Sequence, residues 1–396
     1  MAVAQRIAFV CPRFAEHGTV GGAETLLKAL AERAAAAGRN VEFLTTCATD
    51  HFTWTNTVPP GPRTFGKLRV VFFPVDENRN LNVFNQLQRS IDRRIPLDRA
   101  DEESWISHSV NSRGLIEYLK QNIDRFDRVV MGPYLYGLTY FANLVAPEKS
   151  ALVPCLHDEG FACLSIMKDL FHRTPILLYN TEPEKTLARR LYDLPDRGSV
   201  VGLGMDPFEV SPDAFARRNN LTQPYVMYSG RREELKGTPL LTAYMNAFRL
   251  RTGRDVRLVF TGRGHIETPT GLEDSILDLG FVSELEKREA MAGSLCFIHP
   301  SINESLGIVL LESWLANSPA LVHAKSEVLV DQCRRSGGGL WFKHYPEFEE
   351  CLVRLMDDPA LRSRMAQSGR QFVINQYSWL AVERRLFEAL DGDGPT

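Results

Sequence analysis

Short apolar segments alternate with amphipathic segments along this chain, and this alternation limits the folds that are open to it. The segment RIAFVC at residues 6–11 has the length and composition of a buried strand, and an Ala- and Leu-rich stretch predicts a helix from about Gly22 to Ala37. Gly38 is suited to end that helix, and VEFLTT at 41–46 predicts the next strand. Units of this kind build parallel sheets with helices on both faces.

A second series of the same alternation begins beyond residues 201–213, VGLGMDPFEVSPD, where two Gly and two Pro residues indicate a linker. We therefore predict an α/β protein of two domains, residues 1–203 and 204–377, with a ligand site in the cleft between them. Further strands are predicted at 69–74, 128–131, 151–155, 175–179, 225–230, 256–262, 277–282, 295–300, 320–324 and 339–342. Further helices are predicted at 237–252, 283–292, from about 306, at 326–335 and across 359–390.

Two segments do not fit the alternation. Residues 50–68 are polar and contain VPPGPR, which predicts an excursion away from the sheet. Residues 76–125 are helical in pattern and rich in charge, so they are either a pair of solvated helices or an added helical element beside a partner. Peripheral contact with the inner face of a membrane stays open for this segment, because nearby acids offset its local cations, Arg89, Arg93, Arg94 and Arg99.

The composition is that of a globular protein: 396 residues suit two domains, and 44% are hydrophobic against 24% charged. The N-terminal segment lacks the plan of a signal peptide, and no apolar run reaches the roughly 18–20 residues that span a bilayer, which predicts a cytoplasmic protein. A net charge of −3 gives no support to nucleic-acid binding. Seven cysteines are scattered singly, which predicts buried reduced thiols rather than a disulfide framework or a zinc site.

The segment HPSINESLGIVLLESW, residues 299–314, holds two carboxylates in an apolar run. We predict a strand, a turn, and a helix that begins near Leu306–Gly307. The free N–H groups of a helix start suit phosphate or sugar oxygens, and Gly307 allows a ligand to approach the backbone. Glu304 and Glu312 fit a ligand that has hydroxyls as well as phosphates. The alternative is structural: Glu304 caps the helix, and Glu312 lies at the edge of the core beside a local Arg.

Three further segments carry polar residues after predicted strands, where ligands bind in parallel sheets. The first holds Gly230, Arg231 and Lys236, whose cations suit a diphosphate or simply open a helix at the surface. The second is the pair Gly21-Gly22, which permits close approach to the first helix or merely makes a turn. The third is His157-Asp158, for which a functional role and a structural role are equally open.

Together these segments resemble the family 4 glycosyltransferases. Seven residues separate Glu304 from Glu312, as in that family's E-x7-E motif, and SGRREELKG is similar to its G-R-x4-K-G element. GGAE at 21–24 and His157-Asp158 fall where the family has a glycine loop and a histidine. The resemblance implies the GT-B fold, two Rossmann-like domains whose parallel sheets face across a cleft. It also implies a nucleotide-sugar donor, retention of anomeric configuration, and a last helix near 378–391 that returns to the N-terminal domain.

The resemblance also implies roles for single residues. Glu312 would hold the ribose hydroxyls and Glu304 the transferred sugar, while Arg231 and Lys236 would neutralise the leaving diphosphate and His157 would hydrogen-bond the sugar. The remaining donor-binding positions are Gly21, Gly22, Gly230, Gly262, Ser305, Leu306, Gly307 and Ile308. No metal is required in this family. The only D-x-D, Asp391-Gly392-Asp393, lies in the tail and is expected to be inert.

The function predicted in this way is retaining transfer of a hexosyl group, from GDP-mannose or a UDP-hexose, to a glycan or lipid-linked saccharide in cell-surface polysaccharide or lipopolysaccharide synthesis. Two alternatives stay open: a nucleotide-sugar epimerase or hydrolase, and a catalytically silent sugar-nucleotide-binding partner protein. A Rossmann dehydrogenase is disfavoured, because TGRGH and VGLGMD do not match G-x-G-x-x-G. Two departures from the family leave the donor sugar open: Ser305-Leu306 replaces a Gly-aromatic pair, and Asn317 replaces a turn glycine.

Overall fold

The computed structural model describes residues 5–16, 18 and 21–392, so Asp393 of the tail D-x-D lies outside the described residues. The chain divides into two compact units. The first comprises Met1–Gly204 and Val382–Thr396, and the second comprises Met205–Ala381. Each unit is described by itself below.

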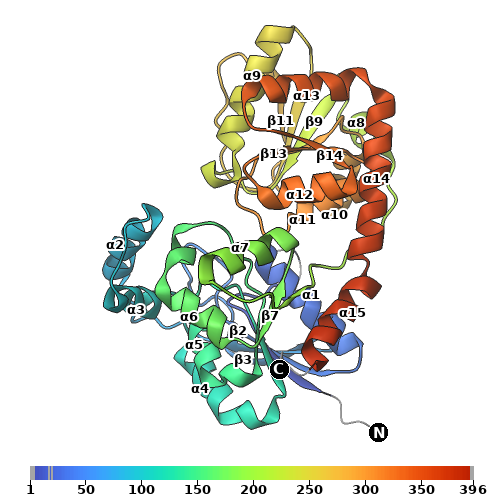
Figure 1. The fold of residues 1–396 in the computed structure, drawn as a ribbon. Helices are drawn as coiled ribbons and strands as arrows, with labels where there is room; N and C mark the ends of the chain where they lie inside the picture. Colours follow the sequence, from blue (N-terminus) through green and yellow to red (C-terminus); the bar gives the residue numbers. More distant parts are fainter. Residues whose placement is uncertain (1–4, 17, 19–20, 393–396) are drawn as a thin grey trace. The chain divides into compact units, whose positions relative to one another are not determined.

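The N-terminal unit is built on an eight-stranded sheet with the order β3-β4-β2-β1-β5-β6-β7-β8 (Figure 1). Its strand pairs are parallel except for β3 with β4. The inner strands are buried along most of their length, as their continuous apolar runs require. The strands are β1 (Arg6–Val10), β2 (Asn40–Thr46), β3 (Gly61–Phe65), β4 (Leu68–Phe73), β5 (Arg128–Met131), β6 (Ser150–Leu152), β7 (Ile176–Tyr179) and β8 (Ser199–Val200).

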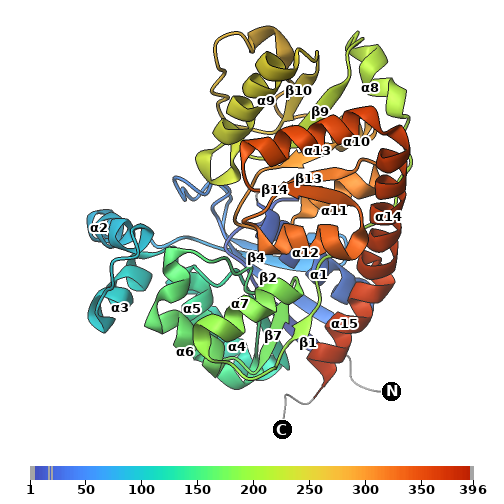
Figure 2. The same cartoon turned by 45° about the horizontal axis from the view of Figure 1, so that its top comes forward.

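Helices of the N-terminal unit lie on both faces of this sheet (Figures 1 and 2). They are α1 (Gly22–Ala36), α2 (Leu81–Asp92), α3 (Arg99–His108), α4 (Arg113–Asn122), α5 (Gly137–Val145), α6 (Ser165–Arg173), α7 (Glu182–Tyr192) and α15 (Trp379–Asp391), with 3-10 turns at Ile123–Arg125, Pro147–Lys149 and Gly160–Cys163. Helix α15 belongs to this unit although it ends the chain. Arg39 at the start of β2 pairs with Asp391 of α15 at 2.7 Å, and Gln5 donates to the Leu390 carbonyl at 3.3 Å.

The C-terminal unit is built on a six-stranded parallel sheet with the order β11-β10-β9-β12-β13-β14. Helices flank it on both faces (Figure 2). The strands are β9 (Tyr225–Ser229), β10 (Arg257–Thr261), β11 (Ile276–Asp278), β12 (Phe297–His299), β13 (Ala320–His323) and β14 (Gly339–Phe342). The helices are α8 (Pro212–Arg218), α9 (Thr238–Thr252), α10 (Glu284–Ala292), α11 (Ile308–Leu315), α12 (Glu327–Ser336), α13 (Tyr345–Asp357) and α14 (Pro359–Tyr377), with 3-10 turns at Glu234–Lys236 and Glu273–Ser275.

The predicted fold class, α/β with two domains built on parallel sheets, is confirmed. The prediction for residues 50–68 was partly wrong, because Gly61–Phe65 forms β3 and pairs antiparallel with β4 at the edge of the sheet. The middle of this strand is exposed, including Arg63 and Thr64, because an edge strand has solvent on one side. Its polar sequence therefore did not indicate a strand. The turn residue Asn317 has the expected left-handed conformation, with φ 58°.

The charged segment at 76–125 is helical as predicted, and most side chains of its helices α2 and α3 are at least partly exposed, but this pair of helices also has a buried face. Helices α2 and α3 form a hairpin that stands out from the sheet, and α4 follows it (Figures 1 and 2). Trp105 of α3 is 1% exposed and stacks between Phe84 and Phe161, with ring centroids 6.0 and 5.8 Å away. The hairpin therefore packs onto the segment that precedes α6.

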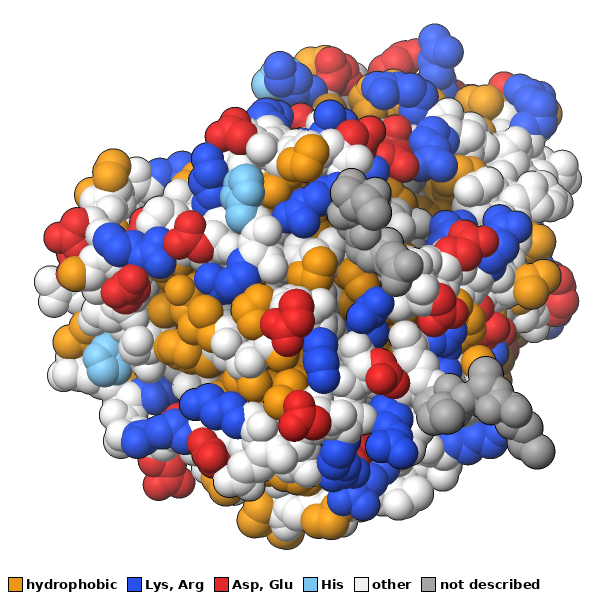
Figure 3. Space-filling model, turned by 60° about the horizontal axis from the view of Figure 1, so that its bottom comes forward, with side chains coloured by type: hydrophobic (Ala, Val, Ile, Leu, Met, Phe, Trp, Pro, Cys, Tyr) orange, Lys and Arg blue, Asp and Glu red, His pale blue; other side chains and the backbone are white. Residues whose placement is uncertain are grey.

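Charged side chains of both signs are interspersed on the face that Figure 3 draws. Within the expected local run of cations, Arg94 pairs with Asp158 at 2.7 Å, and Arg99 pairs with Glu103 and Asp169 at 2.7 and 2.6 Å. None of the helices in the described part of the chain is both long enough and apolar enough to cross a membrane.

The seven cysteines all lie within the described residues, and none of them is in a disulfide bond. Five are buried as predicted, but Cys351 is only partly buried and Cys163 is exposed.

Candidate functional site

The ion pair between Lys236 and Glu304 lies at the carboxyl ends of two neighbouring strands of the C-terminal unit. Strands β9 and β12 pair in parallel through Met227 and Phe297. The loops that follow these strands therefore meet at one edge of the sheet. Lys236 Nζ donates to Glu304 Oε1 at 2.7 Å, and the two side chains are 23% and 13% exposed. This brings together two of the residues predicted from separate motifs.

Two glycines allow these loops to meet. Gly237 caps α9 with φ 72°, and a Cβ there would lie 2.6 Å from the Pro300 carbonyl oxygen. Gly307 is the N-cap of α11 with φ 76°, and a Cβ there would lie 2.6 Å from Leu329 Cδ2. Both conformations favour glycine. Because Gly307 is the N-cap, Glu304 does not cap α11, and the structural role predicted for it is not observed.

His299 lies beneath the same ion pair. It ends β12, its ring is buried, and its Nε2 lies 3.6 Å from Glu304 Oε1. Neither ring nitrogen has a hydrogen-bond partner among the described residues. Burial lowers the pKa of His299 to about 4, against the opposing effect of the Glu304 carboxylate. The ring is therefore neutral at neutral pH.

Glu312 lies one turn into α11 and is held by a lysine rather than by an arginine. Lys287 of α10 lies 3.0 Å from Glu312 Oε2 and 2.9 Å from Glu284. Burial acts to lower the pKa of Lys287, but the carboxylates of Glu312 and Glu284 outweigh it, so this pKa lies above its usual value. Lys287 was not predicted from the sequence, because nothing in its segment marks it as a partner of α11.

Gly230 and Gly262 lie against each other at the ends of β9 and β10. A Cβ on Gly262 would lie 2.0 Å from the Gly230 carbonyl oxygen, and both glycines have positive φ angles, 150° and 114° for Gly230 and Gly262. The next residue, Arg231, extends its guanidinium to 3.4 Å from Glu233 and is about half exposed. Arg231 thus stands at the same edge of the sheet as Lys236, with its cation near solvent.

His157 of the N-terminal unit lies in a loop after β6 that a buried carboxylate anchors. Glu184 is 1% exposed, and it accepts the N–H groups of Leu156 at 2.6 Å and Asn180 at 2.5 Å. Burial raises the pKa of Glu184 to about 7, while its hydrogen bonds to backbone N–H groups and the nearby His157 oppose the shift. On the other side, His157 Nδ1 lies 3.6 Å from Glu159 Oε1.

The α2–α3 hairpin holds the far part of the same loop. Arg94 donates to both the carboxylate and the carbonyl of Asp158, at 2.7 and 2.8 Å. Glu102 of α3 is buried and accepts the N–H groups of Ser165 and Ile166, each at 3.0 Å. The segment 157–164 is therefore bracketed by two buried carboxylates that come from α7 and α3.

Gly21 and Gly22 lie at the start of α1, after β1. A Cβ on Gly21 would lie 2.2 Å from Glu24 Oε2, so this position is tightly packed. Glu24 is buried and pairs with the buried Arg13, whose Nε donates at 2.9 Å. The loop with Gly21 and Gly22 follows β1, and the loop with His157 follows β6. Both loops therefore lie at the carboxyl edge of the N-terminal sheet, where β5 separates the two strands.

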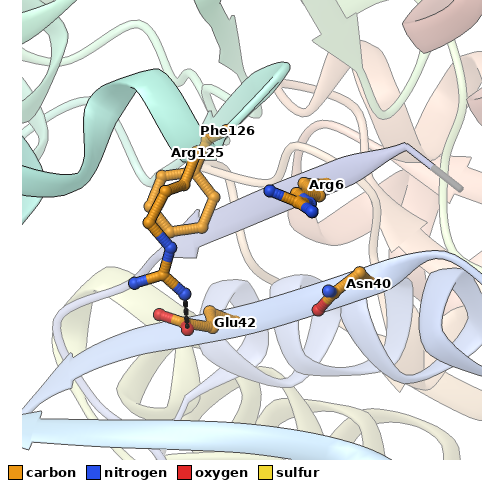
Figure 4. A pocket seen from close by; sticks show the side chains of 5 residues that line it. All are labelled: Arg6, Asn40, Glu42, Arg125 and Phe126. Carbon is orange, nitrogen blue, oxygen red and sulfur yellow. Dashed lines mark hydrogen bonds and ion pairs between the residues drawn. The ribbon is translucent and has the colours of Figure 1, made fainter. Parts of the chain in front are cut away.

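Two pockets lie at opposite edges of their sheets. The pocket in Figure 4, about 280 Å³, lies at the amino ends of β1, β2 and β5 and is lined by Arg6, Asn40, Glu42, Arg125 and Phe126. Its carboxylate, Glu42, already has Tyr118 and Arg125 as partners, at 2.8 and 3.3 Å. A second pocket of about 310 Å³ lies at the carboxyl ends of β10 and β11, beside Asp278. Parallel sheets bind ligands at the carboxyl edge, so the second pocket is the better candidate for a ligand site.

Within the described ranges, no group of three or more His, Cys, Asp or Glu side chains could hold a metal ion.

Comparison with known proteins finds a family match for part of the chain. Residues 211–372 match the family model described as "Glycosyl transferases group 1". The match lies within the C-terminal unit. The matched residues include Arg231, Lys236, Glu304 and Glu312.

Curated relatives extend the similarity beyond residues 211–372. The chain is 31% identical over 205 residues to an alpha-D-kanosaminyltransferase of Streptomyces kanamyceticus, covering 46% of this chain and 51% of that protein. It is 27% identical over 316 residues to a D-inositol 3-phosphate glycosyltransferase of Corynebacterium efficiens, covering 74% of this chain and 70% of that one. The match thus spans about half the length of the first relative.

Solved structures share the fold of the whole chain. Sucrose-phosphate synthase from Thermosynechococcus elongatus has a TM-score of 0.72 at 16% identity, covering 97% of this chain and all of that one. The Anabaena protein HepE, in complex with UDP and glucose, has a TM-score of 0.68 at 16% identity, covering 98% and 100%. At these identities the similarity shows the fold alone, and that fold is GT-B-like.

Proposed function

We propose that this protein is a retaining glycosyltransferase that moves a hexosyl group from a nucleotide sugar to a saccharide acceptor. The observation that carries the proposal is the ion pair of Lys236 with Glu304, at the carboxyl ends of β9 and β12 and beside the start of α11. A cation and a carboxylate at one helix start suit a ligand with both phosphates and hydroxyls. The match of residues 211–372 to glycosyl transferases of group 1 supports the same reaction class.

In the proposed mechanism, the leaving diphosphate is stabilised by Lys236, Arg231 and the free N–H groups at the start of α11. Charge on the diphosphate develops as the glycosidic bond breaks, so fixed cations lower the barrier without a metal ion. Glu304 accepts hydrogen bonds from hydroxyls of the transferred sugar, and Glu312 accepts them from the ribose. His157 hydrogen-bonds the sugar from the N-terminal unit. The acceptor hydroxyl attacks on the face that the diphosphate leaves, which retains the anomeric configuration.

The donor is proposed to be GDP-mannose or a UDP-hexose. The relatives named above are a kanosaminyltransferase and an inositol 3-phosphate glycosyltransferase, and HepE was solved with UDP and glucose. The acceptor is proposed to be a glycan or lipid-linked saccharide of a cell-surface polysaccharide. The protein would then act in the cytoplasm at the inner face of the membrane, which sedimentation with anionic liposomes at low salt tests directly.

A thermal-shift screen of GDP-, UDP-, ADP- and dTDP-sugars identifies the donor, because a bound nucleotide raises the melting temperature by mass action. Transfer is then measured with that donor for Lys236→Ala and Glu304→Gln, with the exposed Lys343→Ala as control. We expect each site variant to lower kcat/KM by about a hundredfold or more. Unchanged rates in both site variants would show that the reaction centre lies elsewhere, and equal product without acceptor would show hydrolysis or epimerisation instead.

A further inference from the structure

His299 is a buried polar side chain with no hydrogen bond. It is 3% exposed, and neither Nδ1 nor Nε2 has a hydrogen-bond partner within the described part of the chain. An unpaired buried polar group lowers the stability of the folded state, so such groups are few in folded proteins. The apolar side of the ring is well accommodated, because it packs edge-on against Phe297 at 5.7 Å. A packing role alone would be served by an apolar residue, without this cost.

His299 faces Glu304, whose carboxylate already accepts a hydrogen bond from the charged amine of Lys236. Glu304 Oε1 accepts from Lys236 Nζ at 2.7 Å, and the same oxygen lies 3.6 Å from His299 Nε2. An N–H···O bond needs about 2.7–3.2 Å, so a movement of roughly 0.5 Å would close the gap. The same oxygen thus has an engaged donor, Lys236, and a second potential donor close by, His299.

We propose that His299 is a positioning residue that takes over Glu304 Oε1 when Lys236 turns to the diphosphate of a bound nucleotide. This inference rests on the proposed function, since it assigns to Lys236 the role of a diphosphate ligand. The departure of Lys236 would take from this nearly buried carboxylate the donor that lies 2.7 Å from Oε1, and the loss of such a donor from a buried charge is costly.

The chemistry of the ring suits this role better than a second cation would. A neutral imidazole carries one N–H and one acceptor nitrogen, and the tautomer with hydrogen on Nε2 donates to Glu304. Burial keeps His299 neutral at neutral pH, with a pKa of about 4. Glu304 would therefore keep its full negative charge beside the sugar while the positive charge of Lys236 serves the diphosphate.

The test measures the affinity for UDP and GDP by isothermal titration calorimetry, in two backgrounds. His299→Gln keeps an N–H near the position of Nε2, whereas His299→Asn offers one near Nδ1 and His299→Leu offers none. In the otherwise native protein we expect Asn and Leu to weaken nucleotide binding about tenfold to a hundredfold, and Gln to stay within about threefold. In a Lys236→Met background, Glu304 has already lost the lysine before the nucleotide binds. There we expect the three His299 substitutions to change the affinity less than about twofold.

The outcomes separate the inference from the proposed function. If the native protein binds neither UDP nor GDP nor any nucleotide sugar at millimolar concentration, the proposed function is wrong and this inference falls with it. If the native protein binds nucleotide but His299→Asn weakens binding equally in both backgrounds, His299 acts through packing and the inference alone is wrong. If Gln and Asn behave alike in the native background, the position of the N–H does not matter and the inference is again wrong.

Discussion

At the scale of single residues, Glu184 differs from the two carboxylates of the C-terminal site. Glu304 and Glu312 each face a lysine, so their charge is paired. Glu184, in the N-terminal unit, instead accepts hydrogen bonds from backbone N–H groups. In the proposed function, Glu304 and Glu312 bind hydroxyls of the ligand. Glu184 instead fixes a loop, and its burial without a paired lysine or arginine in the described part of the chain raises its pKa.

The raised pKa of Glu184 predicts how stability changes with pH. Its value is about 7 in the folded protein against 4.5 in the unfolded chain. Between these values the folded state holds a proton that the unfolded state has released. The free energy of unfolding therefore falls as pH rises from about 4.5 to about 7, and the contribution of this group is about 3 kcal/mol when complete.

Urea unfolding at pH 5 and pH 7.5 checks this prediction. We expect Glu184→Gln to remove about 2–3 kcal/mol of the stability lost between the two pH values, because all other groups titrate alike in both proteins. Glu182→Gln, an exposed position two residues away, should keep the wild-type difference because it leaves Glu184 intact. A Glu184→Gln protein with the wild-type pH dependence would contradict the assignment.

At the scale of elements, the α2–α3 hairpin supports the loop that carries His157. Gly160 is where the two meet: a Cβ there would lie 2.0 Å from the Ile91 carbonyl oxygen at the end of α2. That neighbour is backbone, so Gly160→Ala must push the hairpin away from the loop. We expect a loss of about 1–3 kcal/mol in the free energy of unfolding. We also expect a lower kcat with nearly unchanged nucleotide affinity, since the nucleotide is proposed to bind mainly to the C-terminal unit.

Gly114 offers a matched control on the neighbouring helix. A Cβ at Gly114 would meet only Phe73 Cδ1, at an ordinary 3.8 Å, and the residue lies within α4. Gly114→Ala should therefore be neutral or stabilise the protein by up to about 1 kcal/mol. If the two variants unfold at the same urea concentration and transfer at the same rate, the hairpin does not support the His157 loop.

The same hairpin shows where sequence-based prediction reached its limit. The inner strands and the helix at α11 were predicted because continuous apolar runs and glycine positions are local signals. The helices within residues 76–125 were predicted, but their packing was not, because partners of Glu102 and Trp105 include Ser165 and Phe161, which lie more than 50 residues away. Lys287 and Glu184 were missed for the same reason, since nothing within their own segments marks them. His299 stood within the quoted motif, but its missing hydrogen bonds become visible only in three dimensions.

At the scale of the whole molecule, the last helix joins the end of the chain to its beginning. Helix α15 buries Val382, Leu386 and Leu390 in the N-terminal unit, although the residues before it belong to the C-terminal unit. The N-terminal unit is therefore built from two stretches of sequence that the C-terminal unit separates. Nucleotide binding, by contrast, is proposed to need mainly the C-terminal unit.

This arrangement predicts that a change in α15 weakens one unit selectively. Leu386 is 0% exposed and Leu380, on the same helix, is 82% exposed. We expect Leu386→Ala to lower the free energy of unfolding by about 2–5 kcal/mol, and Leu380→Ala to change it by no more than about 0.5 kcal/mol. Calorimetric scans are run with and without the nucleotide that the thermal-shift screen selects. The transition that this nucleotide does not raise is assigned to the N-terminal unit, and we expect Leu386→Ala to lower the temperature of that transition. Loss confined to the nucleotide-sensitive transition, or equal losses from both leucines, would show that α15 does not stabilise the N-terminal unit.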